Sequence, residues 1–190
     1  MTMPHVSPNK KRFVFLLIGI LIFVLDQWSK YPFRTGWQLG QSKPITSFLA
    51  FTYVQNTGSL AGMFAGHTLV LGLISLFVSL GIIWYAWKLP RSSGWLPYVT
   101  LGILLGGATG NGWDRLIHRF VVDFFDLQWH GKNIWPVFNV ADIAVDVAIV
   151  LFIIMAIIEP DEAKDQNIDA PFEHENLSQK AIDKENSETL

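Results

Sequence analysis

Six aspartates are the residues of this sequence whose type and placement suggest chemistry. Ahead of residue 161 the chain has seven acidic residues, and all but Glu159 are aspartates: Asp26, Asp114, Asp123, Asp126, Asp142 and Asp146. Four of them fall within "VVDFFDLQWHGKNIWPVFNVADIAVDVAIVLF", residues 121–152, which runs directly into an apolar segment. An ionised carboxylate at the centre of a bilayer costs about 2.5 to 3.5 kcal/mol on insertion scales. Aspartates in such a segment therefore indicate function.

Two carboxylates at short range can do chemistry that neither does alone. Mutual repulsion makes it costly to ionise both, so one keeps a proton while the other remains a base. Such a pair can activate water and protonate a leaving amine without a metal or a nucleophilic side chain. A single aspartate is more simply a helix cap or an ion-pair partner. For Asp123 and Asp142 together the catalytic interpretation is favoured.

The elements that must position these residues are membrane helices, because 51% of the 190 residues are hydrophobic. A helix needs about 20 mainly apolar residues to cross a bilayer. Four segments come close to this length: residues 13–25, 68–87, about 95–113 and about 139–158. We therefore predict an all-α integral membrane protein with four transmembrane helices. In the third segment Gly102, Gly106 and Gly110 stand four apart, a spacing that lets another helix approach closely.

A small β element is predicted between the first two helices. Residues 34–66, "RTGWQLGQSKPITSFLAFTYVQNTGSLAGMFAG", place Thr, Phe, Tyr and Val near period two, interrupted by Gly and Pro. Because this element joins the first span to the second, it is expected to lie on the outer membrane surface.

Four spans place both termini on one side of the membrane. The basic run at residues 10–12, with Lys88 and Arg91, argues that this side is the cytoplasm, although the opposite loops carry a similar number of basic residues. The spans put Asp26 and Asp114 at helix ends, and Asp123 and Asp126 in a loop beyond the third helix. Five aspartates then gather at the outer face, and Asp146 lies one turn deeper in a stripe that it shares with Asn139 and Asp142.

Composition limits the remaining possibilities. Residues 161–190 hold nine acids and three lysines, which predicts a disordered cytoplasmic tail after a transmembrane domain at residues 1–160. The first 160 residues keep 11 basic and seven acidic residues, too small an excess for a nucleic-acid partner. The absence of cysteine excludes disulfides and thiolate catalysis. The five histidines lack zinc-ligand spacing, so neither a metal nor another cofactor is expected.

Five short motifs in one order resemble lipoprotein signal peptidase, the signal peptidase II family. They are "DQWSK" (26–30), "NTG" (56–58), "GGATGNGWDR" (106–115), "VVDFFD" (121–126) and "FNVAD" (138–142). The resemblance covers about residues 13–159. It implies a bacterial inner-membrane aspartyl endopeptidase that removes the signal peptide from diacylglyceryl-modified prolipoproteins, cutting before the lipidated cysteine. It also implies that Asp123 and Asp142 form the catalytic dyad.

The same motifs imply a set of substrate-binding or supporting residues: Asp26, Lys30, Asn56, Gly58, Asn111, Asp114, Arg115 and Asn139. The two asparagines of the later motifs could orient the dyad or simply cap helices. Arg115 could pair with Asp114 or hold a peptide carbonyl. The i, i+4 pair of Asp26 and Lys30 could be an interface bridge. One departure concerns the substrate groove, since Leu60 and Ala61 stand where the family has a small residue and then an aromatic one.

A small transporter or ion-conducting protein is the alternative. A proton or cation relay would use Asp146, which lies outside the dyad, as does Asp126. Against a relay, the aspartates collect near one membrane face, and the sequence has neither an internal repeat nor an interrupted helix pair. As a peptidase the chain is expected to bind a lipid-modified prolipoprotein and membrane lipid, and to act as a monomer.

Overall fold

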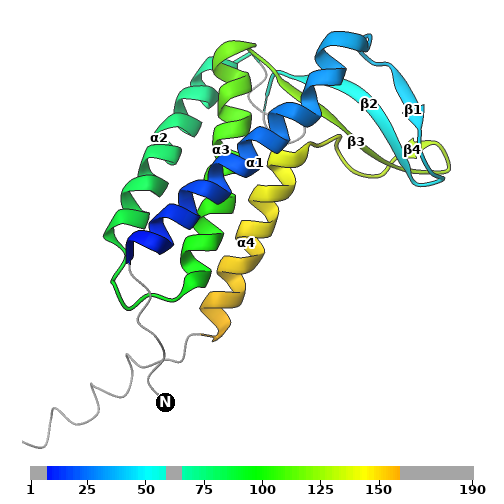
Figure 1. The fold of residues 1–190 in the computed structure, drawn as a ribbon. Coiled ribbons are helices and arrows are strands. Elements are labelled where there is room, and N and C mark those ends of the chain that lie inside the picture. Colours follow the sequence, from blue (N-terminus) through cyan, green and yellow to red (C-terminus); the bar gives the residue numbers. More distant parts are fainter. Residues whose placement is uncertain (1–7, 59–65, 159–190) are drawn as a thin grey trace, which may run out of the picture. The chain divides into compact units, whose positions relative to one another are not determined.

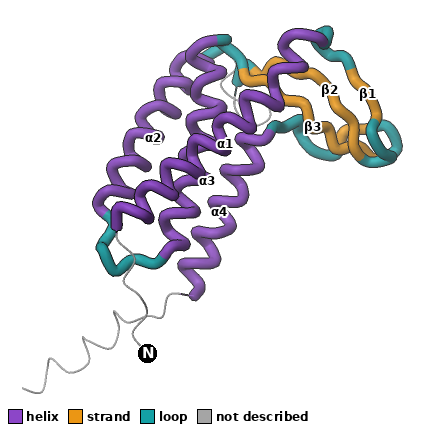
Figure 2. The backbone as a smooth tube through the Cα atoms, viewed as in Figure 1, coloured by secondary structure: helices purple, strands orange, loops and turns teal. Residues whose placement is uncertain are grey.

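Helices and one small antiparallel sheet form the part of the chain that the computed structural model describes, residues 8–58 and 66–158. The helices are α1 (Pro8–Gly36), α2 (Thr68–Lys88), α3 (Trp95–Ile117) and α4 (Val140–Ile158). The strands are β1 (Ser42–Pro44), β2 (Leu49–Asn56), β3 (Val121–Trp129) and β4 (Lys132–Asn133). Helices α1, α2 and α3 run side by side, and the strands lie beyond one end of them (Figures 1 and 2).

Three helices, α1, α2 and α4, are long and apolar enough to cross a membrane. Helix α3 has 23 residues but does not reach the same apolar character, because its second half is the glycine-rich and polar "GGATGNGWDR". This half of the helix is largely buried, so its polar groups face other helices. The protein is therefore an integral membrane protein, mostly helical with a small sheet. The crossing by α3 stays a prediction.

Glycines bring α3 into close contact with α1, as their spacing predicts. A Cβ atom built on Gly102 would lie 2.7 Å from the backbone oxygen of Phe15. One built on Gly110 would lie 2.6 Å from the Asp26 carboxylate. Only glycine leaves room for backbone and carboxylate at these positions. The predicted glycine stripe is confirmed as the surface along which the two helices meet.

The sheet has the order β1-β2-β3-β4, with every neighbouring pair antiparallel. The β element predicted within residues 34–66 is confirmed by β1 and β2, while Leu60 and Ala61 lie outside the described residues. Strand β3 joins from far along the chain and sets Asp123 opposite Val54. Its apolar face packs on the end of α1, where the Phe33 and Phe124 rings stack with centroids 4.4 Å apart. This contact attaches the sheet to the helices.

Two expected positions are wrong. Helix α1 does not end near residue 25 but continues to Gly36, with Asp26 and Lys30 inside it. The helix tolerates these charges because their side chains pair at 2.8 Å in a fully buried setting. Asp123 and Asp126 lie on β3 rather than in a loop, because the β-branched and aromatic residues of "VVDFF" pair along β2. The predicted tail, residues 161–190, lies outside the described residues.

Candidate active site

Asn139 links the two aspartates that the motifs single out. Asp123 stands on β3 and Asp142 in the first turn of α4. The Asn139 Nδ2 donates to Asp123 Oδ1 at 2.6 Å, and its backbone N–H donates to Asp142 Oδ2 at 3.0 Å. In return, the Asp142 N–H donates to Asn139 Oδ1 at 3.0 Å. This reciprocal pattern is a capping box. Asn139 therefore caps the helix and binds both carboxylates. That it orients them for catalysis stays a prediction.

Two further asparagines complete the contacts of the pair. The Asn56 Nδ2 donates to Asp123 Oδ2 at 2.9 Å, and the Asn111 Nδ2 donates to Asp142 Oδ1 at 2.7 Å. Each of the four carboxylate oxygens thus accepts one N–H. An amide donates a hydrogen bond without adding charge. These four hydrogen bonds hold the two carboxylates in place, but their donors are neutral and do not cancel the negative charge of the pair.

Burial changes the acidity of Asp123, which is only 2% exposed. Burial, and after it the negative charge of Asp142, raises the pKa of Asp123 to about 7, against the hydrogen bonds from Asn56 and Asn139. An acid with this pKa holds its proton through most of the range up to neutral pH. One proton shared between two carboxylates is the state that general acid–base hydrolysis requires.

The raised pKa predicts a dependence of stability on pH. Between about 4, the ordinary pKa of aspartate, and about 7, folded Asp123 binds more proton than the unfolded chain does. The free energy of unfolding should therefore fall as pH rises through this window. Asp123→Asn removes this contribution, so the variant should lose less stability than the wild type between pH 5 and pH 8. Thermal unfolding in detergent measures both slopes, and parallel curves for the two proteins would contradict the assignment.

A buried ion cluster lies next to the pair. The Lys30 Nζ is 2.8 Å from Asp26 Oδ2, 3.0 Å from Asp114 Oδ2 and 3.1 Å from Asn111 Oδ1. The side chains of Lys30, Asp26 and Asp114 are fully buried. Asp26 Oδ1 also accepts the Ala141 N–H at 2.9 Å, at the start of α4. The predicted pairing of Asp26 with Lys30 is confirmed, but it lies in the interior and not at the interface.

Arg115 and Gly58 are joined to each other and, through Asn56, to the pair. The Arg115 Nη2 donates to the Gly58 carbonyl at 3.4 Å, and the Gly58 N–H donates to Asn56 Oδ1 at 3.0 Å. Asp114 pairs with Lys30 and Arg34, so the suggested pair of Arg115 with Asp114 does not form. Within residues 8–58 and 66–158 the buried Arg115 Nε has no acceptor.

A cavity of about 280 Å³ opens beside Asp123. It is lined by Val54, Gln55, Asn56, Thr57, Gly58, Asp123, Pro136 and Val137. Its walls are strand β2, the turn after it and the extended segment before α4. The lining is largely uncharged, with one half of the aspartate pair at its side, as a binding site for a peptide would require.

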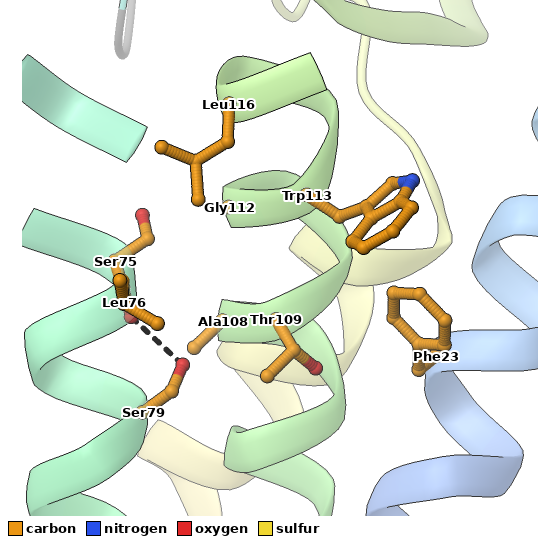
Figure 3. A pocket seen from close by; sticks show the side chains of 9 residues that line it. All are labelled: Phe23, Ser75, Leu76, Ser79, Ala108, Thr109, Gly112, Trp113 and Leu116. Atoms are coloured by element: carbon orange, nitrogen blue, oxygen red, sulfur yellow. Dashed lines mark hydrogen bonds between the residues drawn. The ribbon is translucent and has the colours of Figure 1, made fainter. Parts of the chain in front are cut away.

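A second cavity, of about 130 Å³, lies between α1, α2 and α3 (Figure 3). No aspartate lines it. Its hydroxyl groups are already used within their own helices, since Ser79 donates to the Ser75 carbonyl at 2.7 Å and Thr109 donates to the Leu105 carbonyl at 2.7 Å. The cavity beside Asp123 is therefore the candidate substrate site.

The remaining aspartates stand apart from the pair. Asp126 is buried in the sheet, where its Oδ2 accepts from Thr52 Oγ1 at 2.6 Å and from Gln128 Nε2 at 2.7 Å. Asp146 is exposed on α4. Sequence reasoning missed Gln27, whose Nε2 donates to Asp114 Oδ1 at 3.2 Å. The position of Gln27 inside the motif "DQWSK" could have marked it as a candidate supporting residue.

Comparisons with known proteins show which family the chain is similar to. The family model described as Signal peptidase (SPase) II matches residues 18–158. The lipoprotein signal peptidase of Alteromonas mediterranea is 38% identical over 157 residues, covering 80% of this chain and 85% of the relative. That of Moorella thermoacetica is 40% identical over 138 residues, covering 72% and 88%.

Solved structures show the same fold. A bacterial membrane enzyme determined at 2.3 Å resolution matches with a TM-score of 0.67 and 27% identity, covering 84% of this chain and 93% of that one. Another, at 1.9 Å resolution, matches with a TM-score of 0.66 over 77% and 94%. A family model that covers most of the chain, relatives of this identity and the paired aspartates lead to one assignment. The chain belongs to the signal peptidase II family.

Proposed function

We propose that Asp123 and Asp142 are the catalytic pair of a membrane aspartyl endopeptidase, which removes the signal peptide from diacylglyceryl-modified prolipoproteins by cutting before the lipidated cysteine. Cleavage of prolipoprotein signal peptides is the activity of the family to which the chain belongs. One observation carries the residue assignment: Asn139 binds the buried Asp123 carboxylate of β3 and the half-buried Asp142 carboxylate of α4, and Asp123 lines the cavity.

The chemistry follows from one proton shared by two carboxylates. The ionised carboxylate takes a proton from water as the water oxygen attacks the scissile carbonyl carbon. The protonated carboxylate donates a hydrogen bond to the carbonyl oxygen, on which negative charge develops. A proton then passes to the leaving amine as the C–N bond breaks. The pair ends the cycle with one proton, as it began.

The supporting residues divide into three groups by their contacts. Asn56, Asn111 and Asn139 orient the pair, and Gly58 fixes the Asn56 amide. Asp26, Lys30 and Asp114 form the buried cluster behind it. We assign to Arg115 the binding of a substrate backbone carbonyl, because its buried Nε lacks an acceptor within the described part of the chain.

We also propose that α3 is the fourth membrane crossing. Its 23 residues give a length of about 35 Å at 1.5 Å per residue, enough for a bilayer core of roughly 30 Å. Four crossings place both termini in the cytoplasm if the basic residues near the N-terminus stay inside. The sheet and the pair then lie at the outer face, residues 1–160 form the peptidase domain of a monomer, and residues 161–190 form a cytoplasmic tail.

The transporter alternative needs an acidic side chain deep in the membrane that can pass a proton or a cation to other acidic side chains. Asp146 is the deepest aspartate, but it is exposed on α4, and no hydrogen bond or ion pair joins it to another described residue. Asp123 and Asp142, in contrast, are tied to one another through Asn139. Membership of a peptidase family also disfavours a relay.

Purified protein in detergent should cut a synthetic prolipoprotein whose cysteine carries diacylglycerol. Mass spectrometry is expected to show a single new N-terminus at the lipidated cysteine. The Asp123→Asn variant, purified in parallel, controls for contaminating proteases, and a heat-denatured sample controls for cleavage without any enzyme. If the folded and monodisperse protein does not produce the new N-terminus, the proposed activity is wrong.

Cleavage should be insensitive to chelators, because the carboxylate pair supplies both the base and the acid. We expect the initial rate in millimolar EDTA to equal the rate without it, measured with the same lipid-modified substrate. Loss of turnover in EDTA that added zinc restores would show that the pair binds a metal and would exclude the mechanism above.

A further inference from the structure

We propose that Lys30 is a positioning residue for catalysis, because it fixes the orientation of the Asn111 side-chain amide and so supplies Asp142 with a hydrogen-bond donor. This inference rests on the proposed assignment of the catalytic pair. It gives the buried ion cluster a role beyond joining helices.

The Asn111 amide has two ends with opposite hydrogen-bonding character. Its Nδ2 end must face Asp142, to which it donates at 2.7 Å. If the amide were turned by half a rotation, its oxygen would face a carboxylate oxygen, and Asp142 would lose this donor and gain a repulsive neighbour. The orientation of one amide therefore decides whether Asp142 is held in place.

Two donors select the productive orientation. Asn111 Oδ1 accepts from Lys30 Nζ at 3.1 Å and from Asn139 Nδ2 at 3.1 Å. An ammonium group has three donors and no acceptor, so a turned Asn111 would point its own N–H groups at a cation. A charged donor also binds more strongly than the neutral amide of Asn139. Lys30 thus supplies most of the preference for the observed orientation.

Lys30 can do this because its own position is fixed. It is fully buried, and its other two donors bind Asp26 at 2.8 Å and Asp114 at 3.0 Å. Asp26 in turn accepts the N–H of Ala141, the residue next to Asp142. The cluster therefore holds α1, α3 and α4 together at the point where the Asn111 amide binds the Asp142 carboxylate.

The charge of Lys30 also acts on the pair. Burial is the largest influence on the pKa of Asp123 and raises it, whereas Lys30 lowers it. The groups that face Lys30 are Asp26 from α1, and Asp114 and Asn111 from α3. Around them lie Arg34, which pairs with Asp114 at 3.5 Å, the aspartate pair itself and Arg115. Removing Lys30 should therefore move the pH profile of cleavage upward.

The test compares three variants with a lipid-modified substrate. Lys30→Met leaves Asp26 with a buried unpaired charge and is expected to lower the melting temperature. Asp26→Asn with Lys30→Met removes the ion pair as a unit, which leaves Asp114 with Arg34 and should restore most of the stability. Lys11→Met is the matched control, because Lys11 is also a buried lysine of α1 but donates to the Ser93 carbonyl at 2.6 Å.

If Lys30 positions the pair, the double variant stays impaired after its stability returns. We expect kcat to fall roughly 10-fold to 100-fold, the effect of a small misplacement of a reacting group. KM should change less than about twofold, since Lys30 does not line the cavity. The upward shift of the pH profile is expected in Lys30→Met, in which the cation is removed alone. Lys11→Met should keep the wild-type kcat and pH profile.

A double variant with wild-type kcat would overturn the proposal and leave the cluster as a purely structural link. A fall confined to Lys30→Met, in step with its melting temperature, would do the same. Neither result touches the proposed function, which is tested separately by cleavage of the lipid-modified substrate and by substitution of the catalytic pair itself.

Discussion

Asp123→Asn and Asp142→Asn are each expected to stop cleavage of a lipid-modified prolipoprotein while leaving the protein folded. An amide keeps the volume of the carboxyl group but can neither accept a proton from water nor share one across the pair. Loss of one partner should lower kcat by roughly 100-fold to 10,000-fold. Initial rates in detergent, with melting temperatures measured on the same samples, test this expectation. Normal turnover by either variant would end the dyad mechanism.

Asp146→Asn is the matched control for these variants. It is the same substitution on the same helix, one turn or about 5.4 Å of rise from Asp142, but Asp146 is exposed and lies outside the hydrogen-bond network. Near-normal activity is expected, with an equal or higher melting temperature, because the change removes a charge that is costly in lipid. An inert Asp146→Asn enzyme would instead favour the proton or cation relay.

Lipid modification of the substrate should have the second large effect. A site that lies where membrane helices meet a surface sheet can draw binding energy from acyl chains, at about 0.8 kcal/mol for each buried CH₂. Burial of only four such groups would amount to about 3 kcal/mol, or roughly 100-fold in kcat/KM. A peptide of identical sequence with an unmodified cysteine should therefore be cut at least that much more slowly.

The comparison needs a control for solubility, because a lipidated peptide enters detergent micelles and an unmodified one does not. A peptide that carries a single acyl chain at its N-terminus, away from the cysteine, partitions into micelles without presenting lipid at the cleavage site. It should remain a poor substrate. Equal kcat/KM for all three peptides would show that the cavity beside Asp123 does not use the lipid.

Local chemistry made much of this protein predictable. The runs at residues 68–87 and 139–158 are long and apolar enough to form membrane helices, and the structure shows both, as α2 and α4. The glycine spacing predicted that another helix approaches α3 closely, and the structure shows that this helix is α1. The period-two pattern predicted a small β element, which the structure shows as β1 and β2, since side-chain alternation is a property of a single strand. Ordered motifs identified the family, and so named Asp123 and Asp142.

The length of α1 was not predictable by the same means. A carboxylate followed by a lysine four residues later reads locally as the end of an apolar span. Only the fold shows that Asp26 and Lys30 are enclosed by Asp114 and Asn111 of α3, which makes a charged pair tolerable inside the helix. Burial depends on what packs against a residue, and that neighbour is more than 80 residues away along the chain.

The amino-acid sequence by itself determined which residue types are available for chemistry: a membrane chain without cysteine, with six aspartates ahead of an acidic tail. Only the tertiary structure decided which of these aspartates lie together and which side chains bind them. Strand β3 pairs with β2 across 67 residues of sequence, which carries Asp123 to Asn56, and Asn139 then joins it to Asp142. Contacts of this kind close long loops and are specified by packing over the whole fold rather than by any local pattern.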